Sequence, residues 1–313
     1  MDRRGVLHND QSTVFQILLW FLFIVALFSV LARLGTKYAM IRKLAWDDWI
    51  ILAALSAYLA QCVSISLGAS QGLGKPMSGL TEDAIENFLM AEYASFVFQL
   101  IALALIKWSI SASIQQLSPS ATHQRLDLAL RIVVGVWLLT GVLISLFQCA
   151  LPTPWDYVHS SQCIDRRAWW AYVAIINIGT EFCIIALYFL IIGNLRMSLA
   201  RRSVVLLVFS SRLLIIAISL SQLAVFLEAF PSFDLTMDLW LPTVLNQAVL
   251  STSVLTACGP YLRPFMESLE TGIARVDLPG SEEELSHNRV GLSAYHMSDF
   301  SSSAGCSSRA TDR

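Results

Sequence analysis

Five polar side chains interrupt apolar stretches of the sequence: Glu92, Asn177, Glu181, Asn246 and Gln247. A carboxylate or amide in apolar surroundings needs a hydrogen-bond partner, a proton or water. Asn177 and Glu181 are four residues apart, so on a helix they share one face. We hypothesise that the five side chains converge on a ligand cavity. The compatible alternative is that they join neighbouring helices through hydrogen bonds worth about 1 kcal/mol each.

Motifs of the common enzyme classes are absent from the sequence. It contains no HExxH, no GxSxG, no Walker motif and no aspartate-rich magnesium motif. The five histidines, which also supply no metal-ligand spacing, fall in predicted loops and tails: His8, His123, His159, His287 and His296. We therefore expect no enzymatic activity, no metal and no cofactor.

The composition is that of a membrane protein. Of 313 residues, 56% are hydrophobic and only 14% are charged, and the mean hydropathy is +0.61. The basic residues are scattered between apolar blocks and form no continuous stripe, which argues against a nucleic-acid partner. The lipid bilayer is the expected surrounding.

Seven apolar segments are long enough to cross a bilayer, which takes roughly 20 helical residues. The alternation typical of a transmembrane barrel is absent. The expected fold is all-α, a seven-transmembrane helix bundle. A signal peptide is the alternative for the first segment, but that segment ends in a basic loop without a small-residue cleavage site. The segments are Thr13–Leu34, Asp48–Leu67, Phe88–Ile110, Leu128–Phe147, Ala168–Ile192, Val204–Phe226 and Leu239–Cys258.

Lysine and arginine near the segment ends predict the orientation. They are more numerous in the links after the first, third and fifth segments and at the start of the tail than on the other side, which places the amino terminus outside and the carboxy terminus inside. The expected organisation is an extracellular N-terminus (1–12), a transmembrane domain (13–258), an amphipathic juxtamembrane segment (259–277) and a disordered, serine-rich cytoplasmic tail (278–313). The plasma membrane is the expected location.

The stretch RKLAWDDWIILAALS begins the second segment with two acidic residues, Asp47 and Asp48. The unpaired amides and the dipole at a helix N-terminus favour carboxylates there. We interpret the pair as a helix cap. An additional role, docking a basic residue of another helix such as Lys107 or Arg131, stays open.

Two basic residues lie within the predicted spans. Lys107 is close to one end of the third span, so we expect its long side chain to reach the membrane surface. Arg212, in the sixth span, is a second buried charge for which a link to Asp47 is conceivable.

Two of the six cysteines, Cys149 and Cys163, fall on the predicted outer side, which is oxidising. We expect them to form a disulfide. It would close a loop of about 15 residues, worth roughly 3 kcal/mol, and would hold the proline-rich link between the fourth and fifth spans over the bundle.

Several motifs occur in a fixed order along the chain: WDDWIILAA, GLGK at Gly72–Lys75, IKWSI at Ile106–Ile110, FQCALPTPW at Phe147–Trp155 with Cys163, NIGTE at Asn177–Glu181 and TACGPYLRPFMESLETG at Thr256–Gly272. This ordered series resembles the fungal rhodopsin-domain family, the seven-helix proteins often called Pth-eleven-like. The resemblance covers roughly Ala32 to Gly272. The sequence departs from the family pattern at Glu181, where aspartate is expected, and in a short third cytoplasmic link.

The family name does not imply a retinal pigment here. A retinal Schiff base needs a lysine inside the bundle, typically in the last helix, and Leu239–Cys258 contains none. We therefore expect a protein without retinal.

Two functions remain. The first is a receptor-like protein that senses an extracellular small or apolar ligand and passes the signal to a cytoplasmic partner. No DRY-like or NPxxY sequence supports coupling to a G protein. The second is a non-receptor component, such as a carrier or accessory protein of a fungal secondary-metabolite pathway, a role that the family resemblance also allows.

Overall fold

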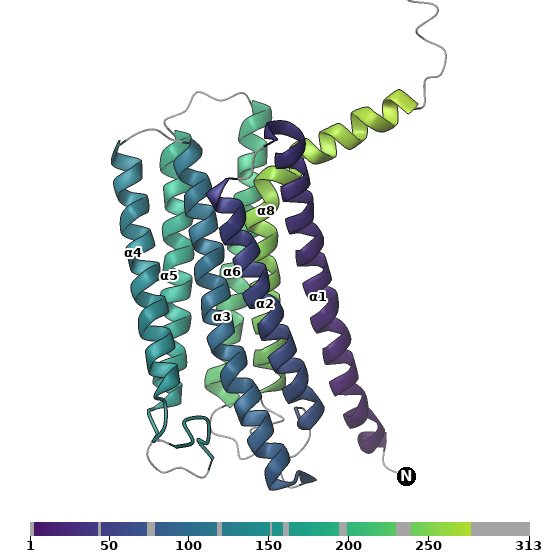
Figure 1. Ribbon diagram of the computed structural model, residues 1–313, viewed down its shortest axis with the longest axis vertical. Helices are drawn as coiled ribbons and strands as arrows, with labels where there is room; N and C mark the ends of the chain where they lie inside the picture. Colours follow the sequence, from purple (N-terminus) through teal and green to yellow (C-terminus); the bar gives the residue numbers. More distant parts are fainter. Residues whose placement is uncertain are drawn as a thin grey trace, which may run out of the picture. The chain divides into compact units, whose positions relative to one another are not determined.

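The chain forms a bundle of long helices. The computed structural model describes residues 3–42, 45–73, 79–117, 121–150, 152–158, 163–193, 199–229 and 239–276. In these residues seven helices are found: α1 (Arg3–Ile41), α2 (Trp46–Gln71), α3 (Glu82–Leu117), α4 (Ala121–Leu146), α5 (Arg166–Gly193), α6 (Leu199–Ala229) and α8 (Trp240–Val276). Up to Arg263 they form one compact unit, whose helices lie side by side (Figure 1). The all-helical fold predicted from the sequence is confirmed.

Six helices are long and apolar enough to cross a membrane within the described residues. They contain Ser12–Ala39, Trp46–Gln71, Glu82–Gln115, Ala121–Leu146, Arg166–Ile191 and Trp240–Pro260. The other helix, α6, has a shorter apolar part, Ser211–Leu227. This is a multi-pass integral membrane protein.

One predicted boundary of the first span is wrong in an informative way. The apolar span begins at Ser12, next to the predicted Thr13, but it continues to Ala39, beyond the predicted end at Leu34, and the helix α1 that contains it runs from Arg3 to Ile41. Arg33 and Lys37, counted from the sequence among charges at the loop, therefore lie within a helix. The predicted amphipathic segment and tail fall mostly outside the described side chains; residues 264–276 are helical and belong to a second unit.

The bundle has apolar side chains outside and polar ones among those inside. On α4, Ile132, Val136 and Leu139 are each more than half exposed, whereas Trp137 is buried. Buried polar side chains include Gln61 and Gln99. Apolar groups that face outward need lipid around them, and polar groups that face inward need partners within the protein.

Small residues set the closest helix contacts. A Cβ atom added at Gly68 of α2 would lie 3.2 Å from the Cβ of Ala91 on α3, and one at Gly141 of α4 would lie 3.0 Å from Leu100. Close backbone approach at small residues is a usual way for helices to associate in lipid. α3 is thereby packed between α2 and α4, and its polar residues Gln99 and Lys107 are buried.

Candidate functional site

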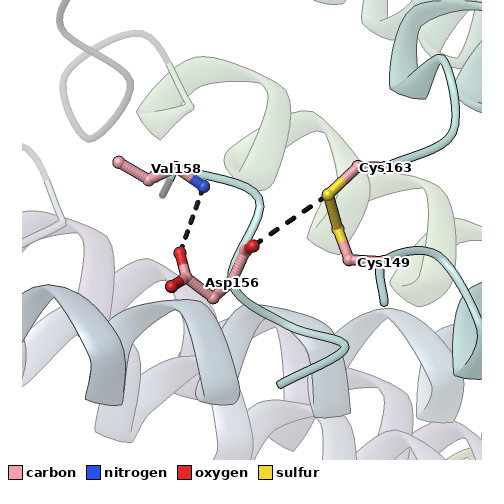
Figure 2. Close-up of a disulfide and its surroundings, with 4 residues drawn as sticks. All are labelled: Cys149, Asp156, Val158 and Cys163. Carbon is pink, nitrogen blue, oxygen red and sulfur yellow. Dashed lines mark hydrogen bonds between the residues drawn. A yellow bond between two sulfur atoms is a disulfide. The ribbon is translucent and has the colours of Figure 1, made fainter. Parts of the chain in front are cut away.

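A disulfide links the end of α4 to the start of α5. Cys149 and Cys163 are bonded, with an S–S distance of 2.03 Å, as predicted. Around the bridge, the Ile164 amide donates to the Gln148 carbonyl at 2.9 Å. Figure 2 shows Asp156 beside the disulfide: its carbonyl lies 4.0 Å from Cys163 Sγ, and its carboxylate accepts from the Val158 amide at 3.2 Å. We call this end of the bundle the disulfide end.

The bridged loop is held against α3 by Glu92. One carboxylate oxygen of Glu92 accepts from the Tyr157 hydroxyl at 2.6 Å, and the other lies 3.0 Å from Arg166 Nη2. The Arg166 guanidinium also lies 3.4 Å from the centre of the Tyr157 ring, within cation–π distance. Burial, and next the Glu92 carboxylate, raise the pKa of Tyr157 well above its usual value. Tyr157 therefore stays a neutral donor and fastens the loop to α3.

Three small cavities occupy the half of the bundle nearest the disulfide end, and Phe96 and Trp170 line all three. The α5–α6 cavity, the loop cavity and the α8 cavity have volumes of about 30, 10 and 20 Å³. Because one water occupies about 10–15 Å³ on this measure, each has room for one or two waters. The ring centres of Phe96 and Trp170 are 4.6 Å apart, and Trp170 also stacks on Phe226 at 4.6 Å. These aromatic rings divide one region into three compartments.

Further polar side chains line each compartment. Glu92 lines both the loop cavity and the α8 cavity, Asn246 lines the α8 cavity, and Asn177 lines the α5–α6 cavity. Gln99, shared by two cavities, exchanges hydrogen bonds with Asn246, which also accepts from Gln222 Nε2 at 2.8 Å. The structure thus brings three of the five predicted cavity residues to one region.

Gln99 and Gln222 are cavity residues that sequence analysis did not single out. Gln99 lies seven residues after Glu92, on the same face of α3, and that spacing could have identified it. Asn177 differs from these amides because its Oδ1 atom accepts no hydrogen bond from any described residue, although the residue is only 6% exposed. Asn177 therefore brings an unpaired acceptor to the wall of the α5–α6 cavity.

The other two predicted cavity residues line none of the three cavities. Gln247 donates through Nε2 to Gln61 at 2.9 Å, and Gln61 donates in turn to Ser95 at 3.2 Å. These bonds connect α8, α2 and α3. Gln247 therefore joins helices, which was the alternative interpretation of the amides.

Glu181 lies between two buried cations. Its two carboxylate oxygens are 2.6 Å from Lys107 Nζ and 2.7 Å from Arg212 Nη1. Lys107 also donates to the Thr180 hydroxyl at 2.9 Å and to the Asn177 carbonyl at 3.3 Å. All three charged side chains are 2% exposed or less. We call Lys107, Glu181 and Arg212 the central charge cluster; it joins α3, α5 and α6.

Two expectations about these cations are therefore wrong. Lys107 does not reach the membrane surface, because Glu181 and the polar groups of α5 satisfy its ammonium within the bundle. Arg212 pairs with Glu181 rather than Asp47. Hydropathy placed both residues inside spans, but it could not show which way each helix is rotated.

Asp47 and Asp48 form a second buried cluster with α1, at the end of the bundle away from the disulfide. Asp47 lies 2.6 Å from Arg33 and 2.5 Å from Lys37, and Asp48 lies 2.8 Å from Lys37. Arg33 also donates to the Ala257 carbonyl of α8 at 3.1 Å. The cations within ion-pair distance are thus residues of α1 rather than Lys107 or Arg131, and Ser113 of α3 also donates to Asp47 at 3.4 Å.

The cap interpretation also describes one of these acids. Asp48 Oδ2 accepts from the Ala45 backbone amide at 2.9 Å, at the N-terminus of α2. Arg131 has its own partner four residues earlier on α4, Asp127, at 3.1 Å. Asp127 in turn accepts from Ser111 of α3. Among the residues whose positions are described, no group of histidine, cysteine, aspartate or glutamate could hold a metal ion.

Comparison with known proteins gives one family. The model of the fungal rhodopsin domain matches residues 32–268, which is more than half of the chain. No curated protein matches the sequence significantly. The matched range contains the disulfide, all three cavities and both buried charge clusters, and it agrees with the resemblance seen in the sequence motifs. The chain belongs to the fungal rhodopsin-domain family.

Proposed function

We propose that this protein is a receptor-like sensor of a small, mainly apolar extracellular ligand, and that it works without retinal. In this proposal it has seven transmembrane helices with the amino terminus outside, so that the disulfide end faces the exterior of the plasma membrane. The observation that carries the proposal is that three cavities meet at one pair of rings, Phe96 and Trp170.

The cavities are too small for a ligand in the observed conformation. Ligand sites usually have volumes of about 300–1,000 Å³, whereas the largest of these three cavities has about 30 Å³. Trp170 is the partition that could change this, because its indole borders every compartment. A rotation of Trp170 would join the compartments, and a ligand that takes the place of the indole would stabilise the joined form.

The lining indicates the chemistry of the ligand. Phe96, Leu103 and Phe226 present apolar surface to the α5–α6 cavity. Asn177 Oδ1 is an acceptor without a protein donor there. These features suit an apolar molecule that carries one hydroxyl or N–H group.

Two structural links support signalling from this region. Lys107 of the central charge cluster donates to the backbone carbonyl of Asn177, so movement at the cavity wall displaces a buried ion pair. On α8, Val249 lines the α5–α6 cavity, and Ala257 further along the helix accepts from Arg33. A rearrangement of the cavity is therefore connected to the opposite end of the bundle.

Indole is a suitable probe of the cavity, because it replaces the side chain removed in Trp170→Ala and carries one N–H group. We expect indole to raise the thermal stability of full-length Trp170→Ala protein in nanodiscs in a saturable way. 1-Methylindole should bind about threefold to tenfold more weakly, since it cannot donate to Asn177. Trp169→Ala is the matched control, because Trp169 is a buried neighbour that lines none of the three cavities. Equal indole effects in both variants would refute the cavity assignment.

The receptor step is tested at Cys258, which is buried near the contact between α8 and Arg33. In protein whose other unbridged cysteines are replaced by alanine, indole binding to Trp170→Ala should change the rate at which a thiol reagent labels Cys258. Binding without any change at Cys258 would contradict a receptor and leave the pathway component as the better proposal.

A further inference from the structure

The central charge cluster has an unbalanced charge. It contains two cations, Lys107 and Arg212, and one anion, Glu181, all buried between α3, α5 and α6. Among the described residues, Glu181 is the carboxylate that lies within ion-pair distance of either cation. With all three side chains ionised, the cluster carries one excess positive charge, and burial of an uncompensated charge in a membrane is highly unfavourable.

The other buried ion pairs provide the comparison. Arg33 and Lys37 face Asp47 and Asp48, two cations against two anions. At the disulfide end, one cation faces one anion. Charge balance is thus achieved elsewhere in the described bundle, and the central cluster is the exception.

The unpaired donors of Arg212 show where the missing negative charge fits. Its Nη1 atom binds Glu181 at 2.7 Å, whereas its Nε and Nη2 atoms are buried and have no hydrogen-bond partner among the residues that the structure describes. Nε and Nη2 form one edge of the guanidinium, and their N–H groups point in parallel. That edge matches the two oxygens of a carboxylate, the usual bidentate partner of arginine.

We propose that the protein binds one small monovalent anion at the Nε/Nη2 edge of Arg212. The geometry favours a carboxylate over a halide, since a carboxylate supplies two acceptors. The bound anion would neutralise the cluster and satisfy both free donors. The proposal does not rest on the receptor function: Arg212 is ten residues before Gln222 on α6, about 15 Å of helix from that cavity residue.

A neutral Lys107 is the competing explanation of the charge balance. It would remove the excess charge, but it would leave both N–H groups of Arg212 unpaired. It would also weaken the contact between Lys107 and Glu181, whose atoms lie only 2.6 Å apart. An anion accounts for the charge and the free donors together.

The test measures thermal unfolding of the full-length protein in nanodiscs at constant ionic strength. HEPES, an anion too bulky for a buried site, is replaced in steps by formate, acetate or chloride. We expect a saturable rise in the unfolding temperature. A larger effect of formate than of chloride at equal concentration assigns a carboxylate, and an equal or larger effect of chloride assigns an inorganic ion. No saturable effect of any of the three would overturn the proposal.

Variants of the cluster have opposite expected effects on anion affinity. Arg212→Lys keeps the charge and removes the bidentate edge, so we expect affinity to fall at least about tenfold. Glu181→Gln removes the competing negative charge, so affinity should rise at least about tenfold. Arg33→Lys is the matched control, because Arg33 is a buried arginine of a balanced cluster, and it should leave anion affinity unchanged.

Lys107→Met separates the two explanations. It removes the excess charge, so anion affinity should fall if Lys107 is charged in the native protein and should stay the same if Lys107 is neutral. If Arg212→Lys does not fold, the other two variants still test the anion site, because anion affinity should rise in Glu181→Gln and fall in Lys107→Met. Unchanged affinity in both would refute the anion site.

Discussion

Removal of the negative charge from Glu181 tests the architecture of the central cluster. Glu181→Gln keeps the shape of the side chain, but it leaves Lys107 and Arg212 close together without a counter-charge. Breaking a buried ion pair by removal of one partner costs about 3–5 kcal/mol. For a domain of this size, that loss corresponds to a fall of at least about 6 °C in the unfolding temperature.

Lys107→Met should be milder than Glu181→Gln. It leaves a neutral pair, Glu181 with Arg212, and loses the bonds of Lys107 to Thr180, to the Asn177 carbonyl and to Glu181. At about 1 kcal/mol for each bond, we expect a loss of about 3 kcal/mol, at the lower end of the range for Glu181→Gln. The double variant should be less destabilised than the sum of the singles, with a coupling of at least about 1.5 kcal/mol.

Native cysteines provide the assay. Cys62 and Cys258 are buried, so a thiol-reactive fluorophore labels them only when the bundle opens. The exposed Cys183, and Cys306 near the end of the sequence, are replaced by alanine. Unfolding is followed in HEPES buffer, so that no small anion compensates for the lost carboxylate. If Glu181→Gln is silent, or Lys107→Met is the more harmful of the two, the assignment of Glu181 as the shared counter-charge is incorrect.

Three further predictions concern the disulfide end and the topology. Replacement of Cys149 and Cys163 by serine should lower the free energy of unfolding by about 3 kcal/mol relative to the oxidised protein. Mass spectrometry of a non-reduced digest should find the two peptides linked, and free thiols at both positions would contradict the bridge. Tyr157→Phe should cost about 1.5–3 kcal/mol, because it leaves the Oε2 atom of Glu92 without its hydroxyl donor, while Arg166 still binds Oε1. The pKa of Tyr157 is raised in the folded protein, so the stability that its neutral hydroxyl contributes is complete below the pKa of an unfolded tyrosine and is lost at higher pH. The loss of stability caused by Tyr157→Phe should therefore be constant over roughly pH 6–9. A loss that varies across this range would refute the assignment of Tyr157 as a neutral donor. Glycosylation acceptors engineered at the two chain ends should be modified only at the amino terminus, and modification at the tail would reverse the proposed orientation.

The parts of the structure that sequence analysis predicted are those that depend on single segments. Long apolar runs predicted the helices, because a segment in lipid must satisfy its own backbone hydrogen bonds. Compartment and spacing predicted the bridge between Cys149 and Cys163. In both cases the deciding information lies within a short stretch of the chain.

Pairing of side chains was harder to predict, because it depends on how helices are rotated about their axes. Lys107 and Glu181 are 74 residues apart, and nothing in their local sequence indicates that they meet. Trp170 was unremarkable for a similar reason: apolar residues surround it in sequence, and only packing places its ring at three cavities. Arg33 is different, because it lies four residues before Lys37 in an apolar run. Two cations in such a run need a carboxylate close by, and this could have been inferred from the sequence.

The contact between α1 and α2 has a consequence for biosynthesis. Arg33 and Lys37 find their partners, Asp47 and Asp48, only 10 to 15 residues later in the chain. The two helices can therefore leave the translocon as a hairpin that is already neutral. Lys107, in contrast, enters the membrane before the ribosome has made Glu181, so α3 must be held at the protein-conducting channel or against α2 until α5 emerges.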